Sequence, residues 1–119
     1  MTKSELLQRT KSYALRIIRV VQALPRSDVA HILGNQLLRA GTSVGANYRA
    51  ACRARSGADF VNKLKIVEEE GDESLYWMEL LIESGSMPSR RLAALLREGD
   101  EIVAIVVSAL KTLRSRPLA

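Results

Sequence analysis

The chain has 119 residues, 47% of them hydrophobic and 26% charged, so it can bury one core without disulfides or metal and is too apolar for wholesale disorder. Its single cysteine, Cys52, cannot form an intramolecular disulfide, and no signal-like segment opens the chain, so we expect a cytoplasmic location. No apolar run approaches the roughly 20 residues of a membrane-spanning helix, so we expect no membrane insertion.

The net charge of +5 is unevenly distributed. Residues 1–65 carry 12 basic and three acidic side chains, a net charge of +9, whereas residues 66–119 carry six and ten, a net charge of −4. In an antiparallel bundle such halves either pair with each other or leave a basic face for an anionic partner. The sequence alone leaves both interpretations open.

The first predicted helix covers residues 3–24. Thr2 and Glu5 have the spacing of a capping box, apolar or small residues then recur every three or four positions, and Pro25 ends the pattern. Basic side chains lie on its polar face: Arg9, Lys11, Arg16 and Arg19. This face is either a solvated surface or a contact surface for nucleic acid.

The second predicted helix covers residues 28–55 and opens at Ser27 or Asp28. Gly41 and Gly45 lie in a stretch of small residues near its middle. Each glycine costs the helix about 1 kcal/mol relative to alanine, so we expect a neighbouring helix to pack closely there.

Asn47 follows this stretch, in an otherwise apolar region. If it is buried, its amide needs partners, and we expect these on a facing helix, with an interface or ligand role as the alternative. His31, the only histidine, is expected at the surface. It has no second histidine or cysteine at metal-ligand spacing.

The third predicted helix covers residues 57–84 and begins at a second capping-box spacing, formed by Ser56 and Asp59. Residues 68–73 of this helix hold five carboxylates. When the second and third helices fold back on each other, we expect these carboxylates to pair with arginines and fix the register of the helices. The residues expected in these pairs are Arg39, Arg49, Glu69, Asp72 and Glu73.

The fourth predicted helix covers residues 89–114, and residues 102–107 within it are apolar on more than one side, which could line a subunit contact. Four helices of this length with short loops predict an all-α fold, an antiparallel up-down-up-down four-helix bundle forming one domain over residues 1–119.

Catalytic chemistry finds little support in the residues. A di-metal carboxylate bundle needs inward-facing glutamates and two Glu-x-x-His pairs, and this sequence has none. The single histidine and single cysteine have no orienting carboxylate nearby in sequence, and no glycine-rich nucleotide fingerprint is present. We therefore expect a protein that is not an enzyme and needs no metal or cofactor.

The stretch TSVGANYRAACRARSGADFVNKLKIVEEEGDESLYWMELL, residues 42–81, carries a specific resemblance. It resembles the four-helix bundle proteins encoded in intervening sequences of bacterial 23S ribosomal RNA genes, a family that includes the accessory protein of diversity-generating retroelements. The shared motifs are SVGAN (43–47), RARS (53–56), DF (59–60), and a run from KIVEEE to LYW (65–77). The resemblance implies a homopentameric ring, and from its retroelement member it implies binding of a reverse transcriptase and its RNA.

Two function classes follow. In the first, the bundle docks onto RNA, DNA or a partner that handles them, through a basic surface; its candidate residues are Arg9, Lys11, Arg16, Arg19, Arg49, Arg53 and Arg55. Aromatic stacking platforms are scarce, which favours duplex or structured RNA over single strands. In the second, the protein is a structural or orphan bundle whose arginines are used within the fold. The predicted structural residues are Arg39, Gly41, Gly45, Asn47, Glu69, Asp72 and Glu73.

Overall fold

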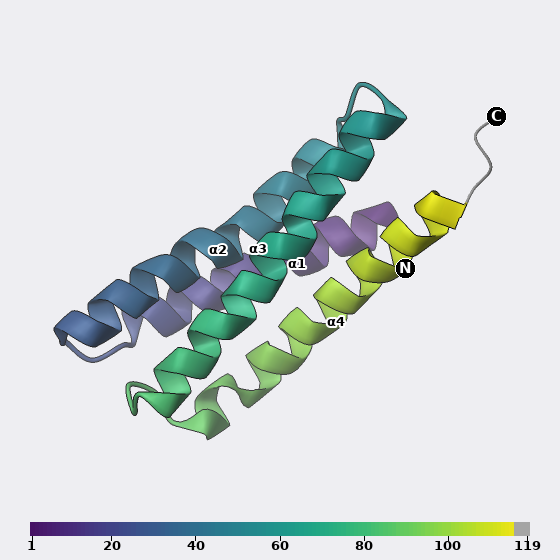
Figure 1. Cartoon of the computed structure of the whole chain (residues 1–119). Coiled ribbons are helices and arrows are strands. Elements are labelled where there is room, and N and C mark those ends of the chain that lie inside the picture. Colours follow the sequence, from purple (N-terminus) through teal and green to yellow (C-terminus); the bar gives the residue numbers. More distant parts are fainter. Residues whose placement is uncertain (116–119) are drawn as a thin grey trace.

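The computed structural model describes residues 1–115, which form four helices and no strand (Figure 1). The helices are α1 (Lys3–Gln22), α2 (Asp28–Cys52), α3 (Gly57–Glu83) and α4 (Ser89–Ser115). Consecutive helices run in opposite directions in an elongated body of 54 × 21 × 21 Å. The predicted four-helix bundle is therefore confirmed, and residues 116–119 of the predicted domain lie outside the described part.

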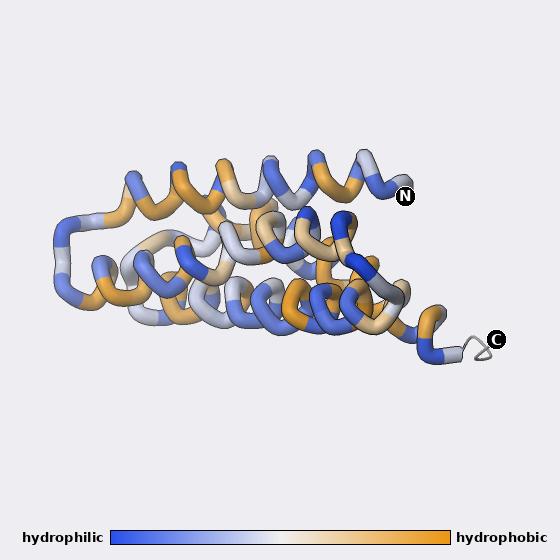
Figure 2. Tube along the Cα trace, turned by 90° about the horizontal axis from the view of Figure 1, so that it is seen from above, coloured by the Kyte–Doolittle hydropathy of each residue, from blue (hydrophilic) through white to orange (hydrophobic). Residues whose placement is uncertain are grey.

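The contact between α2 and α3 is the most extensive in the bundle, and the contact between α1 and α4 is the sparsest. Hydrophilic and hydrophobic residues recur in turn along the helices, most clearly along α1 (Figure 2). Each helix buries one apolar stripe in a shared core, as helical periodicity requires.

Serine and threonine caps begin the first three helices. The side-chain oxygens of Thr2, Ser27 and Ser56 each accept a backbone N–H three residues later, at 3.1 Å. These bonds satisfy donors that a helix start otherwise leaves without a partner. Ser27, not Asp28, is thus the cap of α2.

Helices α1 and α2 end earlier than predicted, at Gln22 and Cys52 rather than at positions 24 and 55. In both, the last turn tightens into bonds between residues three apart, such as Leu24 N–H to Val21 O at 3.3 Å and Ala54 N–H to Ala51 O at 3.0 Å. Sequence periodicity does not distinguish this tightened turn from a further turn of α-helix.

Helix α3 ends at a Schellman motif. Gly85 adopts a φ of 79°, and its N–H bonds Ile82 O at 3.0 Å while Ser86 N–H bonds Leu81 O at 3.0 Å. The buried side chain of Met87 follows at once. The motif reverses the direction of the chain, so that α4 packs against the core in the direction opposite to α3.

A buried hydrogen-bond chain crosses the middle of the core. Tyr13 on α1 is 1% exposed, and its hydroxyl lies 2.9 Å from Ser74 Oγ on α3. Ser74 Oγ donates to Gly71 O at 2.6 Å, so the tyrosine must be the donor of the first bond. Burial raises the pKa of Tyr13 to about 12, which keeps this donor protonated at neutral pH.

Glycines make room for this and other close approaches. A Cβ at Gly99 on α4 would lie 2.6 Å from Tyr13 Oη and 2.7 Å from Leu75 Cδ2. On α2, a Cβ at Gly41 would overlap Ile17, and one at Gly45 would lie 3.3 Å from the backbone oxygen of Thr10. The small stretch of α2 therefore faces α1, whose backbone it lets come close.

The expectation about the partners of Asn47 is wrong. Asn47 is half-buried, and its amide donates to Ser43 O at 2.9 Å and Ser43 Oγ at 2.8 Å, on its own helix and not on a facing one. One turn separates the two residues, so a local partner is in reach. Within residues 102–107, Ile102 and Val106 enter the core while Val103, Ile105 and Val107 are half-buried, and a subunit contact through this segment stays a prediction.

We predict that Gly99→Val lowers the free energy of unfolding by about 2–3 kcal/mol, because the new side chain overlaps Tyr13 and Leu75 in a packed core. The matched control is Gly57→Val, at an exposed position where a Cβ has nothing within 4 Å, and it should change stability by no more than about 0.5 kcal/mol. Urea unfolding followed by circular dichroism measures both. Equal losses would show that Gly99 provides no needed space.

Candidate nucleic-acid interface

The seven basic residues predicted to bind nucleic acid do not form one surface. Arg9 and Arg16 lie toward α4, whereas Lys11, Arg49 and Arg53 line a groove between α1 and α2. Arg19 is exposed further along α1, and Arg55 is exposed in the turn between α2 and α3. Only the groove brings several of them together.

Arg9 is engaged within the fold. Its guanidinium donates to both carboxylate oxygens of Glu98, at 3.0 and 2.6 Å, and to Glu101 at 2.9 Å. Both Arg9 and Glu98 are largely covered, with side chains 27% and 19% exposed. Hydrogen bonding to Arg9 lowers the pKa of Glu98, to which the charge of Arg16 adds a smaller effect. These groups clamp α1 to α4, where helix contact is otherwise sparse.

The groove between α1 and α2 is open to solvent and has a volume of about 610 Å³. Four cationic side chains line it: Lys3, Lys11, Arg49 and Arg53. Its remaining lining is small, apolar or neutral, including Leu7, Ala14 and Gly45, and no Asp or Glu is among the lining residues. None of the four cations forms an ion pair within residues 1–115.

The spacing of these cations follows from helix geometry. Lys3 and Lys11 are eight residues apart on α1, about 12 Å along the axis. Arg49 lies in the last turn of α2, and Arg53 is the C-cap residue four positions later. The four positive charges thus follow the length of the groove on both of its walls. Such a row matches a chain of phosphates better than it matches one small anion.

Sequence reasoning missed Lys3. Its helical spacing relative to Leu7, Lys11 and Ala14, at steps of three and four, could have placed it on the same face of α1. The pairing of this face with Arg49 and Arg53 depended on the register between α1 and α2, which the sequence does not show.

The acidic block on α3 pairs with fewer residues than expected. Arg39 bonds Glu70 at 3.2 Å and also bonds Glu73, which accepts a further bond from Trp77 Nε1 at 3.2 Å. Glu69 and Asp72 are exposed and form no ion pair in the described part of the chain, because they lie on the outer face of α3. Arg49, expected near this block, lines the basic groove instead.

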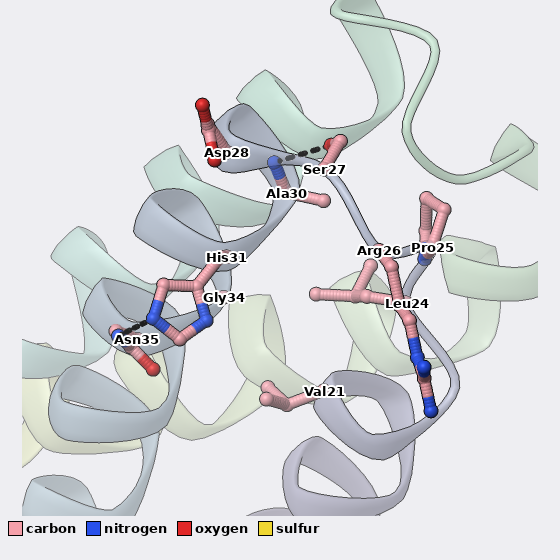
Figure 3. A pocket seen from close by; sticks show the side chains of 10 residues that line it. All are labelled: Val21, Leu24, Pro25, Arg26, Ser27, Asp28, Ala30, His31, Gly34 and Asn35. Carbon is pink, nitrogen blue, oxygen red and sulfur yellow. Dashed lines mark hydrogen bonds between the residues drawn. The ribbon is translucent and has the colours of Figure 1, made fainter.

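A second pocket, of about 460 Å³, lies at the turn between α1 and α2 (Figure 3). His31 is exposed there, as expected, and its Nε2 lies 3.3 Å from Asn35 Nδ2. Only one acidic residue, Asp28, lines this pocket with it. Residues 1–115 contain no group of three or more His, Cys, Asp or Glu side chains arranged to hold a metal ion. Within the same residues, no helix is long and apolar enough to cross a membrane.

The fold and the groove define a four-helix bundle with a basic groove on one face. The model of the 23S rRNA-intervening sequence protein family matches residues 2–108, so the chain belongs to this family and the resemblance seen in the sequence is confirmed. A crystal structure of a protein with unknown function from the S23 ribosomal protein family of Bacteroides thetaiotaomicron is 34% identical. It has a TM-score of 0.83, and the alignment covers 89% of this chain and 98% of that one. No curated protein matches the sequence.

We predict that Arg9→Gln lowers the free energy of unfolding at pH 7 by about 1–2 kcal/mol, because it leaves Glu98 covered and without its partner. Lys11→Gln, an exposed change on the same helix, should cost no more than about 0.5 kcal/mol. Urea unfolding measures both.

The loss of unfolding free energy caused by Arg9→Gln should depend on pH. Since the pKa of folded Glu98 is below its ordinary value of 4.5, the stabilisation is present above that value and is lost as pH falls through the folded pKa. The difference between the parent and Arg9→Gln should therefore shrink at pH 3. An undiminished difference would mean that the ion pair is not its source.

Proposed function

We propose that this protein is a non-enzymatic bundle that binds nucleic acid through the phosphate backbone, using the basic groove between α1 and α2. The observation that carries the proposal is the gathering of four cations, from α1 and from the C-terminal end of α2, in one groove with no carboxylate among its lining residues. These cations are Lys3, Lys11, Arg49 and Arg53, and the groove that they line is open to solvent. Phosphate contacts of this kind give affinity with little reading of sequence.

The alternative is a structural bundle whose arginines all serve the fold. Arg9 and Arg39 support it, because both bond to carboxylates of another helix. The groove favours binding, because its cations have no such partners in the described part of the chain. We accordingly propose that nucleic acid binds at the groove and that Arg9 stabilises the fold.

We predict that the triple variant Lys11→Gln/Arg49→Gln/Arg53→Gln loses most of its affinity for an RNA or DNA hairpin at low salt. Removing three phosphate contacts should also reduce the slope of log K against log salt. Each contact contributes about 0.7–0.9 to this slope, so the slope should fall by about 2–3. Fluorescence anisotropy over a salt series measures both quantities.

The matched control is Arg90→Gln/Arg91→Gln/Arg97→Gln, which removes the same charge from exposed positions on α4. It should bind nearly as the parent does. Cys52, the only thiol, lines the groove and reports occupancy, since a bound hairpin should slow its alkylation. A parent that binds nothing at low salt, or two triple variants that lose affinity equally, would contradict the proposal.

We also propose that the chain assembles into a homopentamer, as the family resemblance implies. Large apolar side chains exposed on α1, α2 and α3 support a contact between copies; they include Leu15, Val29, Ile32, Ile66 and Tyr76. A ring would repeat the basic groove, so several weak contacts could sum to useful affinity.

For a chain of 13.2 kDa, light scattering should report about five chain masses at micromolar concentration. A monodisperse monomer under these conditions would refute the assembly. The groove variants should leave the mass unchanged if assembly and binding use different surfaces.

The remaining parts of the proposal concern surroundings and partners. We propose a cytoplasmic location, which the single cysteine and the basic, nucleic-acid-directed groove support. A reverse transcriptase partner rests on the resemblance alone. An adjacent reverse transcriptase gene with a variable repeat would support it, and a surrounding ribosomal RNA gene would support an intervening-sequence origin.

A further inference from the structure

The basic groove also holds neutral side chains that can both donate and accept hydrogen bonds. Ser4 and Gln8 on α1 and Thr42 on α2 line it together with the four cations. Ser4 and Gln8 are exposed, and within residues 1–115 their side chains form no hydrogen bond with another residue. Thr42 donates to Leu38 O at 2.7 Å and keeps its oxygen as an acceptor.

These neutral groups lie between the cations along α1. Ser4 and Gln8 are one turn apart, about 6 Å, and Lys3 and Lys11 flank them about 12 Å apart. One strand of a nucleic acid carries a phosphate about every 3.4 Å of helix axis, so this length spans three to four nucleotides. Along such a strand riboses alternate with phosphates, and the groove offers two neutral side chains, Ser4 and Gln8, between its two lysines.

The ribose is where RNA and DNA differ. Lysine and arginine only donate, and they bind phosphates that both polymers carry. A serine hydroxyl and a glutamine amide donate and accept, which suits the 2′-hydroxyl of RNA, itself a donor and an acceptor. None of the groove's lining residues is aromatic, so base stacking does not contribute there.

We propose that the groove binds the sugar–phosphate backbone of RNA in preference to DNA of the same sequence, with Ser4 and Gln8 contacting 2′-hydroxyls. This inference rests on the proposed function, because it assigns a substrate class to the same groove. The lysines and arginines supply affinity for either polymer, and the neutral side chains supply the preference.

The test compares three hairpins of one sequence in the full-length protein: RNA, DNA and 2′-O-methyl RNA. RNA should bind about threefold to tenfold more tightly than DNA, the effect of one or two added hydrogen bonds. The 2′-O-methyl hairpin lacks the hydroxyl donor and should bind as weakly as DNA. If it binds as tightly as RNA, the preference does not come from the hydroxyl and the inference is overturned.

The variant Ser4→Ala/Gln8→Ala should bring the ratio of RNA to DNA affinity close to one while leaving DNA affinity unchanged. Its matched control, Gln22→Ala/Ser108→Ala, changes exposed residues of the same types outside the groove and should keep the parent ratio. Circular dichroism confirms that both variants are folded.

The outcomes separate the two proposals. If RNA and DNA bind equally and the triple groove variant weakens both, the groove binds nucleic acid and the RNA preference is wrong. If no hairpin binds at low salt, both are wrong. If the double variant loses affinity for DNA as well as RNA, Ser4 and Gln8 do not act through the 2′-hydroxyl.

Discussion

The bond between Tyr13 and Ser74 is the constraint on which the arrangement of the bundle depends. It joins α1 to α3 across the core, and it forms only because Gly99 on α4 leaves room for the phenol ring to pass. A buried hydroxyl without a partner costs about 1–3 kcal/mol, so shifts of register that break this bond are disfavoured. One polar contact in an apolar core thereby favours a single register of α1 against α3 and α4.

The register of α1 in the bundle determines which groups its cationic side chains contact. Arg9 lies one turn before Tyr13, so the register that seats the tyrosine against Gly99 also brings the guanidinium to Glu98. On the other side of the helix, the close approach of Gly45 to Thr10 brings α1 and α2 together, so that Lys11 and Arg49 line the same groove. Helix α1 therefore has its positive charge satisfied on one side and left unpaired on the other.

The sequence predicts the elements well because each leaves a local signal. Capping residues, apolar spacing and Gly85 mark the helices to within three residues, and the motifs within residues 42–81 identify the family. The site is predicted less well, because charge counting treats Arg9 and Lys11 alike although they are only two positions apart. What separates them is the neighbouring helix that each faces, and this is a tertiary property.

The same limit explains the acidic block. Five carboxylates within residues 68–73 predict pairing with arginine, yet a helix turns these side chains in several directions. Glu70 and Glu73 face α2 and meet Arg39, while Glu69 and Asp72 face solvent. The sequence shows that these residues are acidic. Predicting which of them pairs with Arg39 also requires knowing which positions of α3 point toward α2.

The energetics of the groove indicate that the fold gains little or nothing from its cations. Arg49 and Arg53 lie at the C-terminal end of α2, where the helix dipole stabilises a cation by about 0.3–1 kcal/mol, and their mutual repulsion offsets about 0.2–0.5 kcal/mol of this. Lys3 and Lys11 are about 12 Å apart, beyond the Debye length of about 8 Å at physiological salt, so their repulsion is largely screened. This cost is small beside the stability of a typical domain, about 5–15 kcal/mol, and the bundle can keep the groove positively charged. The cations contribute no ion pair to the described fold, which agrees with the proposed contact with an anionic partner.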